Sequence, residues 1–104
     1  MDRARFRALF CADVPEGDAL VAAATQKPLH NSVFGASVPT AAWKTIPSWY
    51  VVSQEDHAIN PDLERFYAKR MGAKTSEVKS SHVAFISHPD VVAKLIEQAA
   101  TAAK

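Results

Sequence analysis

The sequence of 104 residues is poor in cysteine and has neither a long apolar run nor an excess of charge of one sign. Its single cysteine, Cys11, cannot form an internal disulfide or a paired zinc or redox motif, so a reducing compartment is expected. No apolar stretch approaches the about 20 residues of a membrane span or resembles a signal peptide. Twelve Lys and Arg against 11 Asp and Glu give a net charge of +1, which offers no global attraction for nucleic acid or an anionic membrane. The composition therefore predicts one soluble, cytoplasmic domain with a local functional site and with neither of these partners.

Glycine is also scarce, with three in the chain, and six prolines divide the sequence into two unlike halves. Residues 1–47 show weak apolar stripes at helical spacing and a loop over residues 31–40, so we expect a helical and irregular region. Residues 48–104 are more regular. We expect them to form a strand, a helix, a second strand and a last helix within the same α/β domain.

The elements of the second half have clear sequence signals. Residues 48–53 form an unbroken β-branched and aromatic run, which is typical of a strand covered on both faces in a parallel sheet. Asn60 can cap a helix that begins at Pro61 and ends at Gly72, with an apolar stripe formed by Leu63, Phe66, Tyr67 and Met71. Residues 75–80 predict a more polar strand, and Pro89 opens the last helix.

A carboxylate and an imidazole follow the two expected strands. A strand, helix and strand in succession normally form a right-handed crossover with parallel strands, so both strand ends face one edge of the sheet. Asp56 lies three residues beyond the first strand and His82 two beyond the second, and neighbouring strands are about 4.8 Å apart. We therefore expect the two side chains to meet. A carboxylate on Nδ1 of a histidine gives the acid and base pair of a hydrolytic triad.

Several segments resemble the C-terminal portion of a serine-dependent α/β-hydrolase, most closely the small esterase and hydroxynitrile-lyase-like branch. They are residues 49–52 (WYVV), Asp56, 59–61 (INP), 81–82 (SH) and 89–91 (PDV). Residues 11–15 (CADVP), 26–28 (QKP) and 42–47 (AWKTIP) are similar to the end of that family's lid region. The resemblance implies that residues 1–47 are the lid end, that Asp56 is the triad acid and His82 the triad base, and that the substrate is a small ester-like molecule. It implies no cofactor.

The Gly-x-Ser-x-Gly nucleophile elbow of this family does not occur in the sequence. With glycines only at positions 17, 35 and 72 that spacing cannot be written, and a glycine-rich oxyanion segment is missing too. We therefore expect the last third of a hydrolase, through truncation, a split gene or a deliberately produced fragment. Such a chain would be inactive alone. It would expose the outer edge of its first strand and tend to self-associate.

Other interpretations compete with a hydrolase fragment. The exposed strand edge could make the chain a non-catalytic interaction module or a homodimer, and the chain could also be a decayed fragment without function. Asp56, His57, His82 and His88 could in principle surround zinc, but there is neither a His-x-x-x-His pair nor an HExxH sequence, and no metal is expected. Cys11 lies in an apolar helical stretch, which indicates a buried thiol rather than a replacement nucleophile.

Overall fold

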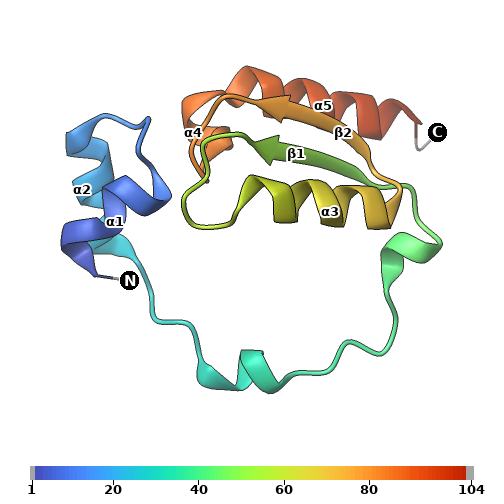
Figure 1. Cartoon of the computed structure of the whole chain (residues 1–104), viewed down its shortest axis with the longest axis horizontal. Helices are drawn as coiled ribbons and strands as arrows, with labels where there is room; N and C mark the ends of the chain where they lie inside the picture. Colours follow the sequence, from blue (N-terminus) through green and yellow to red (C-terminus); the bar gives the residue numbers. More distant parts are fainter. Residues whose placement is uncertain (1, 103–104) are drawn as a thin grey trace.

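The structure is a computed structural model that describes residues 2–102. It contains helices, two short 3-10 turns and two strands (Figure 1). In chain order these are α1 (Arg3–Phe10), α2 (Glu16–Thr25), η1 (Asn31–Gly35), η2 (Ala42–Lys44), β1 (Trp49–Ser53), α3 (Pro61–Met71), β2 (Lys74–Val78), α4 (Ala84–Ser87) and α5 (Pro89–Ala102). The predicted α/β class is confirmed.

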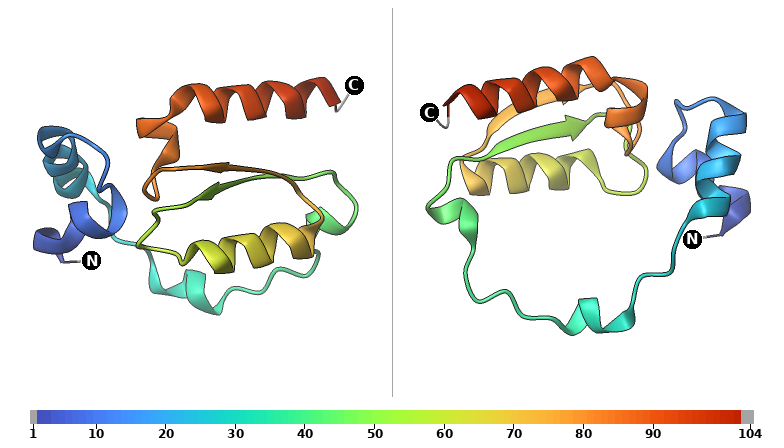
Figure 2. Two further views of the ribbon diagram at one scale, coloured as in Figure 1. Left: turned by 45° about the horizontal axis from the view of Figure 1, so that its top comes forward. Right: turned by 180° about the vertical axis from the view of Figure 1, so that it is seen from behind.

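Strands β1 and β2 pair in parallel, as the sequence order predicts. The register runs from Trp49 opposite Lys74 to Ser53 opposite Val78. Helices α3 and α5 lie on opposite sides of this small sheet (Figures 1 and 2). Main-chain bonding continues past the strand ends, because the Glu55 N–H donates to the Ser80 carbonyl at 3.0 Å. The loops after the two strands are therefore held together.

Helix α3 begins and ends where its capping residues predict. The Asn60 side chain accepts a hydrogen bond from the Asp62 N–H at 2.8 Å, with Pro61 as the first helical residue. Gly72 ends the helix in the left-handed region at φ 61°, which a residue with a Cβ adopts only under strain. The second strand differs slightly from its predicted bounds, because pairing with β1 selects Lys74–Val78 and leaves Ser80 in the following loop.

The apolar stripe expected on α3 is not its buried face. Leu63, Phe66 and Tyr67 are between 43% and 56% exposed, whereas Glu64 and Ala68 are buried. The small Ala68 side chain permits close packing of α3, which contacts β1. An apolar row on α3 therefore remains uncovered by the described residues.

Helices α1 and α2 form a hairpin beside the carboxyl ends of both strands (Figure 1). Its core consists of Phe6, Cys11, Val14 and Ala19, and it also includes Val83 from the loop after β2. The apolar contact with Val83 joins the N-terminal hairpin to the segment that carries His82. None of the helices in residues 2–102 has the length and apolar character needed to cross a bilayer.

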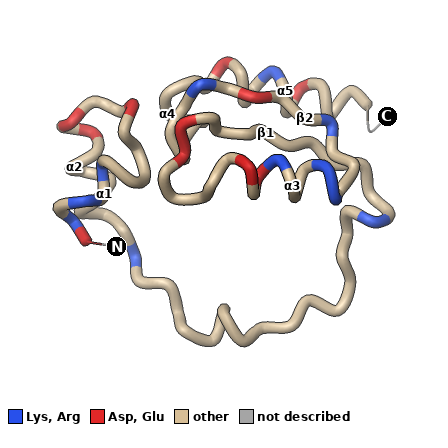
Figure 3. Tube along the Cα trace, viewed as in Figure 1, with Lys and Arg blue, Asp and Glu red and all other residues tan. Residues whose placement is uncertain are grey.

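Residues 26–48 form an arc that runs from the hairpin to β1 away from the sheet (Figure 2). Every residue from 30 to 40 is exposed, and Phe34 and Val38 are 78% and 81% exposed. Residues 28–43 contain no Lys, Arg, Asp or Glu, and this part of the arc is tan between the blue lysine positions at its two ends (Figure 3). The middle of the arc is thus an exposed stretch without charged residues that carries large apolar side chains.

The chain is less compact than a complete domain of its length. Its radius of gyration is 15.4 Å, against about 13 Å for a compact domain of about 100 residues. Its accessible surface is 7761 Å², whereas a folded monomer of 11.3 kDa exposes about 5,700 Å². The difference of about 2,000 Å² is comparable with the total area buried in an extensive protein interface.

Candidate active site

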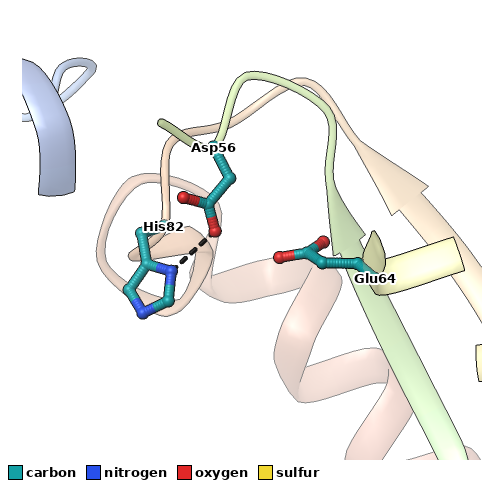
Figure 4. Close-up of side chains that lie close together, drawn as sticks. All are labelled: Asp56, Glu64 and His82. Carbon is teal, nitrogen blue, oxygen red and sulfur yellow. Dashed lines mark hydrogen bonds and ion pairs between the residues drawn. The ribbon is translucent and has the colours of Figure 1, made fainter. Parts of the chain in front are cut away.

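Asp56 and His82 meet at the carboxyl edge of the sheet. Asp56 Oδ2 lies 2.6 Å from His82 Nδ1 (Figure 4). The Asp56 side chain is fully buried and that of His82 is 29% exposed. This distance is that of a strong, charge-assisted hydrogen bond. The structure thus brings together the two residues that sequence reasoning singled out.

The loop after β1 fixes the orientation of the Asp56 carboxylate. Its Oδ1 accepts hydrogen bonds from the N–H groups of Ala58 at 2.6 Å and Ile59 at 2.9 Å, which leaves Oδ2 for His82. Burial alone would raise the pKa of Asp56, but the hydrogen bonds from Ile59, His82 and Ala58 outweigh burial and lower this pKa below its usual value. Asp56 is therefore held as a carboxylate.

His82 is oriented from two sides. Its Nδ1 is directed to Asp56, and its other ring nitrogen points away from both carboxyl groups in Figure 4. The Phe10 ring of α1 packs against the imidazole, with ring centroids 4.7 Å apart and planes tilted by 42°. With Nδ1 occupied, Nε2 is the atom that can exchange a proton with a bound group.

Asp13, which sequence reasoning did not select, connects the helical hairpin to the His82 loop. Its carboxylate accepts hydrogen bonds from the Ser81 N–H at 3.0 Å and from the Ser81 hydroxyl. Burial would raise the pKa of Asp13, but these bonds outweigh burial and lower the pKa. Asp13 thus anchors the residue next to His82, across 68 positions of sequence.

Glu64 is the second residue that sequence reasoning missed. It points from α3 toward Asp56 and His82 in Figure 4. One oxygen of each carboxyl group and one ring nitrogen of His82 all lie within 4.8 Å of one another. The sequence indicates the burial of Glu64 only through its spacing: Glu64 lies four residues before the small Ala68, so both residues share one face of the helix.

A cavity of about 290 Å³ adjoins the imidazole. It is lined by Tyr50, Val51, Ser53, Ile59, Glu64, His82, Ala84, Phe85 and Val92. Larger hollows of about 550 and 430 Å³ lie along the helical hairpin, but neither Asp56 nor His82 lines them. The smaller cavity is therefore a better candidate for a substrate site than these two hollows, because His82 lines it.

The other candidate residues lie apart from this pair. His57 is exposed. His88 Nδ1 lies 4.0 Å from the Asp13 carboxylate and not beside Asp56 and His82. Within residues 2–102, the three side chains with potential metal-ligand spacing are Asp56, Glu64 and His82. Asp56 Oδ2 and His82 Nδ1 lie at hydrogen-bond distance from each other. Cys11 is 2% exposed, and burial raises its pKa, which disfavours the nucleophilic thiolate.

Comparison with known proteins identifies the family. Residues 1–95 match the model of the Alpha/beta hydrolase family, so the chain belongs to the α/β-hydrolases. The match covers both the hairpin with its arc and the sheet, which confirms the resemblance at the level of the family. Neither the curated proteins nor the solved structures give a match.

The lowered pKa of Asp13 predicts a specific loss of stability in acid. A carboxyl group whose pKa is lower in the folded than in the unfolded state stabilises the fold above its unfolded pKa. That contribution is lost as pH falls through the folded pKa. In urea unfolding at pH 6 and at pH 3, we expect Asp13→Asn to show a smaller fall in the free energy of unfolding than the unmodified chain. Glu97→Gln, at an exposed position on α5, serves as the control. An unchanged pH dependence in Asp13→Asn would contradict the assignment.

Proposed function

We propose that this chain supplies the acid and the base of a serine-hydrolase triad that acts on small ester-like molecules. Asp56 is the acid and His82 the base. The observation that carries the proposal is the bond between Asp56 Oδ2 and His82 Nδ1 at the carboxyl edge of a parallel sheet in an α/β-hydrolase. Open α/β sheets place their reacting groups at this edge.

Each residue has a defined part in the reaction. His82 accepts the proton of a serine hydroxyl at Nε2 as the serine attacks the ester carbonyl, and then gives this proton to the leaving alcohol. Asp56 remains ionised, keeps the proton of neutral His82 on Nδ1 and stabilises the imidazolium that forms. Water then hydrolyses the acyl group with the same proton transfers in sequence.

The serine must come from another polypeptide segment, since the 104 residues contain no Gly-x-Ser-x-Gly. The described surface has features suited to such a segment: the arc, which carries no charged residue over residues 28–43, the apolar row on α3 and the outer edge of β1. Covering these surfaces would reduce the accessible area of the chain, which exceeds that of a folded monomer of this size by about 2,000 Å². We propose that a segment with the nucleophile docks there and completes the triad at His82.

Reconstitution tests the proposal. The chain is combined with an N-terminal α/β-hydrolase segment carrying the serine elbow, and hydrolysis of a small aryl ester is measured with each piece alone and with both. We expect activity only in the mixture. Asp56→Asn should lower kcat by about 10⁴-fold, because His82 loses its correct tautomer, and His82→Ala by about 10⁶-fold, because the proton transfer loses its base.

Two comparisons make this experiment decisive. His57→Ala, which alters an exposed imidazole beside Asp56, should retain the reconstituted kcat. A cyanohydrin assayed in parallel separates esterase from hydroxynitrile-lyase chemistry. Full activity in Asp56→Asn or in His82→Ala would show that the triad assignment is wrong.

Assembly through the outer edge of β1 is a second candidate function. In the described residues the sheet has two strands, so no third strand covers this edge. The Ser48 carbonyl accepts a hydrogen bond from the Lys74 N–H, and the Gln54 N–H donates to the Val78 carbonyl. Successive residues of a strand direct their main-chain N–H and C=O groups to alternate edges, so those of Val51 face away from β2. An unpaired edge can bind an added strand from a second copy of the chain.

Proline at position 51 tests edge assembly, because it removes an outward N–H and leaves the inward hydrogen bonds of the sheet in place. We expect the chain to sediment as oligomers and Val51→Pro to shift it to monomers, while Val51→Ala does not. His82→Ala should leave assembly unchanged. A monomeric unmodified chain, or oligomers that persist in Val51→Pro, would exclude this mode of association.

A further inference from the structure

We propose that Glu64 is a positioning residue for the Asp56 and His82 pair, and that it acts as a neutral carboxylic acid directed at the Asp56 carboxylate. The catalytic part of this inference rests on the proposed function. The placement of the proton between the two carboxyl groups rests on the geometry alone.

Two buried carboxyl groups this close do not both ionise easily. Asp56 and Glu64 are each 5% exposed, and one oxygen of each belongs to a group of three atoms within 4.8 Å of one another. Two negative charges at this separation repel strongly when water is excluded, so the pair retains a proton over a wider pH range than an isolated carboxyl group. The structure must therefore favour one of the two groups as its carrier.

The hydrogen bonds assign this proton to Glu64. Asp56 accepts from Ala58, Ile59 and His82, and these three donors stabilise its negative charge. Glu64 accepts one main-chain hydrogen bond, from the Ser53 N–H at 2.8 Å. Burial raises the pKa of Glu64, and the negative charge of Asp56 raises it further, which agrees with this assignment.

Glu64 is buried, and the positive charge of a protonated His82 is the one nearby charge recorded as lowering its pKa, whereas burial and the charge of Asp56 raise it. The titratable groups recorded near it are Asp56, His82 and Tyr50 of β1. Burial and the two carboxyl groups raise the pKa of Tyr50, so its phenol stays neutral. Phe85 of α4 and Val92 of α5 contribute apolar surface to the adjoining cavity.

A protonated Glu64 connects the end of β1 to the carboxylate of Asp56, the proposed triad acid. One oxygen holds the Ser53 N–H on the outer edge of the strand, while the acid proton is available to Asp56. The carboxylate that orients His82 is thereby fixed from α3 as well as from its own loop. The imidazole also faces one negative charge instead of two, which limits the electrostatic stabilisation of its protonated form.

Carboxyl ¹³C NMR of the full chain, labelled in glutamate, tests where the proton resides. We expect the Glu64 side-chain carboxyl carbon to titrate at a higher pH than glutamate in a short unstructured peptide. Titration at the same pH or lower would overturn the proposal. This measurement needs no substituted protein and no activity.

Two substitutions at position 64 then test the positioning role in the reconstituted enzyme. Glutamine can accept from Ser53 and donate to Asp56, so Glu64→Gln should keep the unmodified kcat and its pH profile. Leucine fits a buried site but cannot donate, so Glu64→Leu should lower kcat by about ten- to a hundredfold. Lys69→Gln, on an exposed part of α3, is the control.

Each outcome separates this inference from the proposed function. If Glu64→Gln impairs activity as Glu64→Leu does, or shifts the pH profile to lower pH, the negative charge of Glu64 matters and the inference is wrong. It is also wrong if Glu64→Leu behaves as the unmodified chain does. If Asp56→Asn and His82→Ala retain full activity, the proposed function fails whatever the Glu64 titration shows.

Discussion

The parallel pairing of β1 with β2 is the constraint on which the site depends. It aligns two strand ends that lie 25 residues apart in sequence, from Ser53 to Val78. The hydrogen bond from Glu55 to Ser80 then carries this alignment into the loops. From there Asp56 and His82 need only short excursions to meet. A slip of register would displace one loop along the sheet and separate the two side chains.

Three sets of contacts hold the Asp56 and His82 pair in place, and each comes from a different part of the chain. Main-chain N–H groups in its own loop hold Asp56, α3 presents Glu64 to the same carboxylate, and the N-terminal hairpin holds the His82 loop through Asp13 and Val83. The hairpin is therefore part of the site rather than an appendage. The family model matches residues 1–95, which include both the hairpin and the sheet, and this agrees with that arrangement.

The sequence predicted the features that local rules control. Asn60 and Gly72 bound α3 because caps act within one turn, and the parallel sheet followed from the order of strand, helix and strand. The buried face of α3 could not be predicted in this way, since the large apolar residues Phe66 and Tyr67 outweigh Glu64 in any periodicity argument. The role of Asp13 could not be predicted from the sequence either, because its hydrogen-bond partner Ser81 is 68 residues away and no local pattern joins the two.

The proposed triad depends on Asp56 holding neutral His82 with its proton on Nδ1, so that Nε2 is available as a base. Long-range ¹H–¹⁵N correlation spectra of the imidazoles in the full chain report this tautomer directly, before any nucleophile is supplied. We expect neutral His82 to have a protonated Nδ1 and a bare Nε2, and Asp56→Ala to abolish this preference. A neutral ring protonated on Nε2, or one averaged between both tautomers in the unmodified chain, would contradict it.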